Sequence, residues 1–162
     1  MINVKELLDP HEKSVVCGDI LRALPNWFGN ENSIVDYVKK VQSMPFFVAS
    51  DDDMPVGFVS LKVHNLFTSE VCVMGVLKEY HRQGIGKMLI DSAVEYCMKN
   101  KTEFLTVKTL DESRKSKSYE KTRAFYLSVG FKPLEVFPLL WDKDNPCLFM
   151  AMHVETRHTA GQ

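Results

Sequence analysis

Residues 70–98 read EVCVMGVLKEYHRQGIGKMLIDSAVEYCM, and this stretch decides how the rest of the chain is interpreted. Its first part, from Glu70 to Val76, is largely apolar and rich in β-branched residues, which predicts a buried strand. From Gly84 onward, apolar residues recur at steps of three and four, which predicts one face of a helix. The connecting turn places Gly84 and Gly86 at the helix start, where N–H groups are unpaired and partial positive charge gathers. The stretch therefore predicts a phosphate site.

Two familiar phosphate motifs do not fit this turn. A P-loop requires Ser or Thr after its lysine, but Met88 follows Lys87. A dinucleotide-binding fingerprint requires a third glycine three residues after Gly86, and that position is Leu89. The spacing therefore excludes both motifs.

A third pattern fits the same residues. The segment VLKEYHRQGIGK, residues 76–87, resembles the acyl-CoA pyrophosphate loop of the GNAT (general N-acetyltransferase) superfamily, which reads Gln/Arg-x-x-Gly-x-Gly/Ala after a strand that ends in Val. Gly84 and Gly86 match both glycines, whereas His81 stands at the Gln/Arg position. Because the family uses mainly backbone N–H groups here, we expect the loop to tolerate this histidine. An ordinary strand–turn–helix with packing glycines is the alternative.

A second segment carries the same resemblance. TRAFYLSVGFKPL, residues 122–134, is similar to a later GNAT motif, in which a helix bearing Phe/Leu-Tyr ends at Gly-Phe. Phe125 and Tyr126 fill the first pair, and Gly130 begins the second. Tyr119 stands where the family often has asparagine. Two motifs in the right order make the resemblance specific to the superfamily and to no particular substrate.

The remaining periodicity predicts the other elements. Helices are expected near residues 16–24, 33–43, 84–98 and 119–129, and strands near 46–49, 56–64, 70–76, 104–110, 131–141 and 147–154. Ser33 and Asp36 have the spacing of a capping box. The order matches an α/β GNAT fold, which implies a mixed, mostly antiparallel sheet of six to seven strands flanked by about four helices. We expect a single domain over residues 1–154 and a flexible tail over residues 155–162.

Composition narrows the functional classes. The chain is 45% hydrophobic and 25% charged with a net charge of −1, which predicts a globular protein without a general attraction to nucleic acid or to an anionic membrane. No apolar run approaches the roughly 20 residues of a membrane span, and the N-terminus lacks a signal-peptide core. The four scattered cysteines fit reduced thiols, so we expect a cytoplasmic protein. No side chains have metal-ligand spacing, so no metal site is expected, and a homodimer is left open.

The resemblance implies an acetyl-CoA-dependent N-acetyltransferase that transfers acetyl directly to a primary amine of a small molecule. By resemblance, main-chain groups of Met74, Gly75 and Val76 would pair with the pantetheine arm, and Gly75 could equally be a packing glycine. The pyrophosphate would be wrapped by Arg82, Gln83, Gly84, Ile85, Gly86 and Lys87. A protein or peptide N-acetyltransferase and a non-catalytic acyl-CoA-binding module are the competing hypotheses.

Glu70 is the candidate catalytic base. It precedes Val76 by six residues, the spacing of the catalytic glutamate in the histone-acetyltransferase branch of the superfamily. A carboxylate at the start of a largely apolar strand is costly to bury unpaired, so its presence needs a reason. A glutamate exposed at the strand end is the alternative.

Tyr126 is the candidate acid, because it occupies the position of the tyrosine that protonates the leaving thiolate in this family. A core tyrosine on the helix stripe is the alternative. Weaker candidates for binding the acceptor are four aromatic side chains in segments that line the acceptor side in this family, and one histidine that follows a strand and could face the acceptor. They are Trp27, Phe28, Tyr37, His64 and Trp141. Each could instead be structural.

Overall fold

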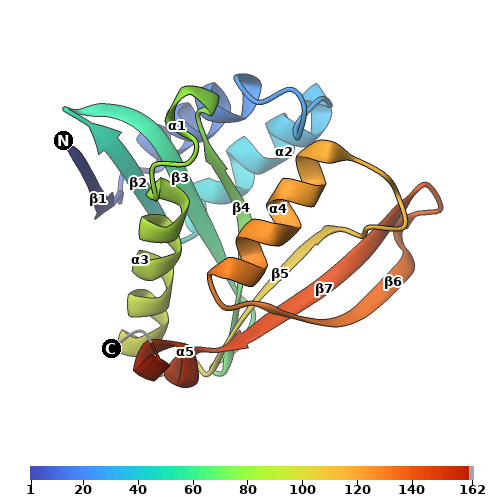
Figure 1. Ribbon diagram of the computed structural model, residues 1–162. Helices are drawn as coiled ribbons and strands as arrows, with labels where there is room; N and C mark the ends of the chain where they lie inside the picture. Colours follow the sequence, from blue (N-terminus) through green and yellow to red (C-terminus); the bar gives the residue numbers. More distant parts are fainter. Residues whose placement is uncertain (161–162) are drawn as a thin grey trace. The chain divides into compact units, whose positions relative to one another are not determined.

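The computed structural model describes residues 1–160, and side chains as far as residue 157. These residues form seven strands and five α-helices (Figure 1). The strands are β1 (Ile2–Glu6), β2 (Phe46–Asp51), β3 (Met54–Val63), β4 (Thr68–Val76), β5 (Phe104–Leu110), β6 (Lys132–Asp142) and β7 (Asn145–His153). The helices are α1 (Pro10–Arg22), α2 (Glu31–Lys40), α3 (Ile85–Lys99), α4 (Lys117–Ser128) and α5 (Val154–Ala160), with short 3₁₀ turns η1 (Val41–Ser43) and η2 (Lys78–Tyr80).

The strands are hydrogen-bonded in the order β1-β2-β3-β4-β5-β7-β6. The pairs β1–β2, β2–β3, β5–β7 and β6–β7 are antiparallel. The structure therefore confirms an α/β fold with a mixed, mostly antiparallel sheet of the predicted size, and it has one helix more than expected.

The chain divides into two compact units. Unit 1 comprises Met1–Val63 and Val71–Tyr96, and unit 2 comprises His64–Glu70 and the chain from Cys97 onward. Strand β4 contributes its first residues to unit 2 and the rest to unit 1. The single domain over residues 1–154 stays a prediction.

In unit 1, alternation along the strands sends apolar side chains to both faces of the sheet. On one face Phe46 stacks on Phe58 at 5.1 Å between ring centroids, and both belong to a cluster with Ile20 of α1. On the other face Phe47 meets Tyr96 of α3 edge-on at 5.9 Å. Helix α3 therefore covers the face opposite α1 (Figure 1).

The starts of α1 and α2 differ from the prediction because asparagine and aspartate cap them. The Asp9 carboxylate accepts a hydrogen bond from Glu12 N at 2.9 Å, so α1 begins at Pro10, one and a half turns before the apolar stripe. Asn30 Oδ1 accepts from the amides of Asn32 and Ser33, so α2 begins at Glu31. The capping box predicted at Ser33 is wrong.

Helix α5 stands where we expected a flexible tail over residues 155–162. His153 precedes the helix, and its Nδ1 accepts from Thr156 N at 3.3 Å, as a capping side chain does. Val154 is fully buried and attaches the helix to unit 2. Residues 161–162 lie outside the described part of the chain.

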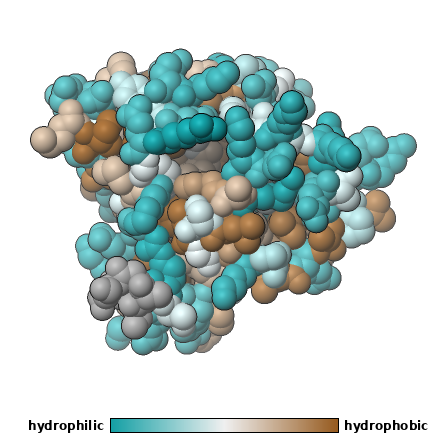
Figure 2. All heavy atoms as spheres, viewed as in Figure 1, coloured by the Kyte–Doolittle hydropathy of each residue, from teal (hydrophilic) through white to brown (hydrophobic). Residues whose placement is uncertain are grey.

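The surface is mostly hydrophilic on the face shown in Figure 2, with apolar residues exposed among the polar ones. Several exposed apolar side chains belong to the edge strand β6: Leu134, Val136, Leu139, Leu140 and Trp141. Among the described residues, no helix is both long and apolar enough to cross a bilayer.

Candidate active site

The predicted phosphate loop lies in unit 1, between η2 and α3. Gly84 directly precedes the helix and has φ of +79°, a left-handed conformation that favours glycine. Its carbonyl accepts the Met88 N–H at 3.1 Å, the hydrogen bond of the first helical turn. The amides of residues 85–87 therefore have no acceptor within the helix. A Cβ built on Gly84 would meet no atom within 4 Å, so the loop is open there. Open space beside first-turn amides fits a diphosphate.

His81, the departure from the family pattern, ties this loop to the end of β4. Its Nε2 lies 2.7 Å from the Val76 carbonyl oxygen, to which it donates a hydrogen bond. The Trp27 ring meets the imidazole edge-on at 5.8 Å between centroids. The histidine thus holds the loop against the strand, and the Val76 carbonyl already has a donor.

The other loop side chains point to local partners. Lys87 Nζ pairs with Asp91 one turn along α3 at 3.0 Å, with 66% of the Lys87 side chain exposed. Gln83 Nε2 donates weakly to the Glu79 carbonyl at 3.4 Å. Arg82 is exposed and has φ of +64°. The loop therefore offers mainly backbone amides, with positive charge at its rim.

Gly75 of β4 faces helix α1. A Cβ there would lie 3.0 Å from Leu24 Cδ1 and 3.2 Å from Ile20 Cγ2. Helix packing therefore explains this glycine by itself. Its neighbours Met74 and Val76 alternate to the other face of the strand and are half-buried. The cofactor-binding roles of Met74, Gly75, Val76 and the loop residues stay predictions.

We expect Gly84→Ala to lower the melting temperature and to weaken coenzyme A binding. The left-handed conformation costs a non-glycine residue about 1–2 kcal/mol, and a methyl group would occupy the open space above the helix amides. Gly84→Asn is the matched variant, because asparagine tolerates left-handed backbone. If the loop binds the diphosphate, Asn should recover stability but not affinity in calorimetry. Full affinity in both variants would contradict a phosphate site here.

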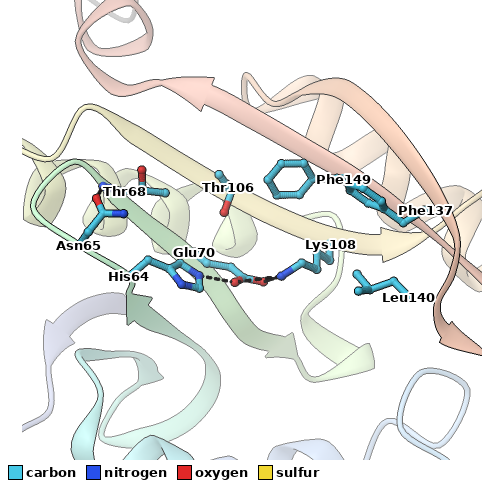
Figure 3. A pocket seen from close by; sticks show the side chains of 9 residues that line it. All are labelled: His64, Asn65, Thr68, Glu70, Thr106, Lys108, Phe137, Leu140 and Phe149. Carbon is cyan, nitrogen blue, oxygen red and sulfur yellow. Dashed lines mark hydrogen bonds and ion pairs between the residues drawn. The ribbon is translucent and has the colours of Figure 1, made fainter.

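A pocket of about 460 Å³ lies in unit 2 (Figure 3). We call it the Glu70 pocket, and its lining residues come from the β3–β4 connection, β4, β5, β6 and β7. They are His64, Asn65, Thr68, Glu70, Thr106, Lys108, Phe137, Leu140 and Phe149. Its volume lies within the range of about 300–1,000 Å³ that small-molecule sites span.

Glu70 lies between His64 and Lys108 in this pocket (Figure 3). Its side chain is only 12% exposed, which makes its partners important. His64 Nε2 is 2.6 Å from Oε1, and because a carboxylate accepts, the imidazole donates its Nε2–H. Lys108 Nζ is 3.1 Å from Oε2 and 3.3 Å from Oε1. The carboxylate predicted as the base is therefore partly buried, paired and directed into a cavity.

Sequence reasoning did not single out Lys108, Phe137, Leu140 or Phe149. Lys108 stood in the apolar strand FLTVKTL, and a lysine there is expensive to bury unless a carboxylate or a ligand meets it. That contrast was the available signal. The apolar residues of β6 and β7 gave no such signal, because the same alternation of apolar and polar residues occurs in any half-buried strand.

The other predicted acceptor-side residues lie elsewhere. Trp27, Phe28 and Tyr37 are partly buried and pack against the core cluster of unit 1. Trp141 of β6 is 47% exposed and is not among the residues that line the Glu70 pocket. Of the five candidates, only His64 lines this pocket together with Glu70.

Tyr126 lies on α4 in unit 2 and is 7% exposed. Its ring contacts Phe125 and Phe131, with centroids 5.5 Å and 5.4 Å away. The aromatic contacts fix the ring, as either a core tyrosine or a positioned acid requires. No group of three or more metal-ligating side chains gathers among the described residues.

Comparison with known proteins identifies the family to which the chain belongs. A family model for the acetyltransferase (GNAT) domain matches residues 42–133, more than half of the sequence. Streptothricin acetyltransferase A of Bacillus subtilis (strain 168) is 25% identical over 131 residues, which cover 68% of this chain and 72% of that protein. A GNAT-family acetyltransferase structure from Desulfovibrio desulfuricans superposes with a TM-score of 0.80 at 15% identity, covering 95% of this chain and 99% of that one. An aminoglycoside 6'-N-acetyltransferase complexed with coenzyme A gives 0.76 at 19% identity, covering 94% and 97%. The chain is an acyltransferase and belongs to the GNAT acetyltransferase family.

Proposed function

We propose that this protein transfers acetyl from acetyl-CoA to a primary amine of a small molecule, with Glu70 as the base. The observation that carries the proposal is the Glu70 carboxylate, 12% exposed and directed into a cavity of about 460 Å³. A carboxylate in a pocket of this size can bind one amine and accept its proton.

Acetyl-CoA as donor is supported by the loop before α3. The open space at Gly84 and the first-turn amides suit the two negative phosphates of a coenzyme A molecule. A structural neighbour of the chain is an acetyltransferase complexed with coenzyme A. When bound, acetyl-CoA supplies the thioester carbonyl carbon that the amine attacks.

The reaction of an ammonium with a thioester yields an amide, a thiol and one net proton. An alkyl amine has a pKa of about 10.4 and arrives mostly as ammonium, so a proton must be removed before its nitrogen can attack. Glu70 accepts that proton, and His64, hydrogen-bonded to Oε1 and one-third exposed, connects the carboxylate to solvent. As the N–C bond forms and the C–S bond breaks, the nitrogen gives its second proton to Glu70, which has already released the first to solvent through His64. The departing sulfur gains a proton from an acid that solvent then reprotonates. Tyr126 is proposed to donate the proton to sulfur.

We expect Tyr126→Phe to lower kcat by roughly 10²-fold or more, as the loss of a positioned proton donor does. Phenylalanine keeps the ring contacts with Phe125 and Phe131. The matched control is Tyr119→Phe, which removes a hydroxyl from another tyrosine of the same helix. Measuring kcat with acetyl thioesters of acidic and basic thiols checks the assignment. An equal effect on both classes of leaving thiol would remove Tyr126 from the role of acid.

The overall proposal is tested by coenzyme A release from acetyl-CoA with a panel of amino acids, polyamines, aminoglycosides and peptides. Acetylation of small amines supports it. Acetylation of peptides alone would favour a protein N-acetyltransferase. Coenzyme A binding without turnover on any amine would favour a non-catalytic acyl-CoA-binding module.

A further inference from the structure

The Glu70 pocket carries a positive charge that acetyl transfer does not require. Lys108 Nζ lies 3.1 Å from the carboxylate proposed to be the base. We propose that the acceptor is an amino acid whose amine and carboxylate are neighbours, and that Lys108 binds this carboxylate. The inference rests on the proposed function and names its substrate class.

Charge balance in the pocket favours an acceptor that carries a carboxylate. Among the described residues that line the pocket, Glu70 is the one carboxylate and Lys108 the one lysine or arginine. An acceptor amine must approach Glu70 and therefore compete with Lys108 for it. A substrate with positive charge alone would leave two cations beside one carboxylate in a half-buried site, which is unfavourable. A substrate that also brings a carboxylate restores neutrality by pairing with Lys108.

The position of Lys108 in the sheet holds its ammonium in the pocket. Its Cα lies in the middle of β5, in register opposite Phe149 of β7, and its Nζ lies 5.9 Å from the centroid of the Phe149 ring. Only 31% of its side chain is exposed. The backbone is fixed by strand pairing and the stem is packed, so the ammonium stays in the pocket when Glu70 changes partner. Once Glu70 has paired with the amine of the acceptor, the Lys108 ammonium needs another anion.

The short distance between the two charges sets the spacing of the ligand. Because Nζ and Oε2 are 3.1 Å apart, groups that bind to each must lie close together on the acceptor. An α- or β-amino acid meets this requirement, and a long ω-amino acid does not. The ion pair between Lys108 and Glu70 thus has the charge spacing expected of the amine and carboxylate of the ligand.

The rest of the lining indicates the side chain of the amino acid. Phe137, Leu140 and Phe149 form an apolar wall from β6 and β7, next to the Lys108 ammonium (Figure 3). An apolar side chain would gain from burial against this wall. Polycations such as aminoglycosides are poorly matched to this pocket, because the described residues that line it include no second carboxylate.

The test compares matched acceptors on the full chain. Coenzyme A release is followed with L-leucine, L-phenylalanine, their amides, 6-aminohexanoate, spermidine and kanamycin. We expect kcat/KM for the free amino acids to exceed that for their amides by roughly 10- to 100-fold, the usual effect of one charged hydrogen-bonded pair. The ω-amino acid and the polycations should be poor acceptors.

Variants of Lys108 separate recognition from folding. Lys108→Met removes the charge but keeps a long unbranched side chain opposite Phe149, and it should bring the acid-to-amide ratio close to one, mainly through KM. Lys108→Arg keeps the charge and should keep the preference. Lys132→Met, on the exposed start of β6, is the matched control and should leave the ratio unchanged.

The outcomes are distinct. Amides or polycations that are better acceptors than free amino acids would overturn this inference and leave the proposed function in place. An unchanged ratio in Lys108→Met would overturn the role of Lys108. Binding of coenzyme A with no amine acetylated would overturn both proposals.

Discussion

Glu70→Gln is expected to lower kcat by roughly 10²- to 10⁴-fold, the usual contribution of a positioned general base. The amide keeps the size of the carboxylate and can still accept the hydrogen bond from His64 at Oε1. It cannot take a proton from the amine, and it no longer neutralises Lys108. Coenzyme A affinity should be unchanged, because the phosphate loop does not include this residue. Steady-state kinetics and calorimetry measure the two effects separately.

The matched control is Glu135→Gln on β6, which changes the same charge at an exposed position of unit 2. It should keep the wild-type rate. Should Glu70→Gln turn over as fast as the wild type, the carboxylate would be a structural partner of Lys108 and His64 and the base would have to be sought elsewhere.

Gly75→Val is expected to destabilise the protein by about 1–3 kcal/mol, the usual cost of inserting extra carbon atoms into a packed core. Even a Cβ at this position would lie 3.0 Å from Leu24 Cδ1 and 3.2 Å from Ile20 Cγ2, closer than side chains normally approach. The backbone is a strand that valine favours, so packing against α1 is the only penalty. Thermal unfolding followed by circular dichroism should show a melting temperature lower by several degrees.

Removing the opposing side chain tests that explanation. Leu24→Ala leaves space where the new Cβ would lie, so the double variant with Gly75→Ala should be more stable than the sum of the two single changes predicts. Strict additivity would show that Gly75 is required for something other than helix packing. Ligand approach along β4 would then be the reason for the glycine.

The strongly periodic segments were the predictable part of the fold. Strand 104–110 was placed at its observed bounds, and the helix predicted from Gly84 begins at Ile85. Strand β1 was missed because it pairs with β2 alone at the edge of the sheet, and only two of its five residues are even partly buried. Such a strand depends on a partner far away in sequence, which no local period records. The start of α2 depended on which of two polar residues caps the helix. The cap is Asn30 and not Ser33, the residue that the sequence predicted.

The candidate site was predictable to the extent that motifs mark it. Glu70 and His64 were both named, and the structure brings them to 2.6 Å. Lys108 was not, because the register that sets it beside Glu70 arises from the pairing of strands distant in the chain. The aromatic candidates Trp27 and Tyr37 had apolar spacing that serves a core as well as a substrate cleft, and they pack on the core of unit 1.

The ion pair between Lys108 and Glu70 also bears on turnover. Acetylation converts a basic nitrogen into a neutral amide, which has no charge with which to hold the carboxylate. The lysine then recaptures its original partner, and the modified molecule loses one of its two anchors at the moment it is formed. Under the proposed mechanism, the contact that selects the incoming acceptor would also favour departure of the product.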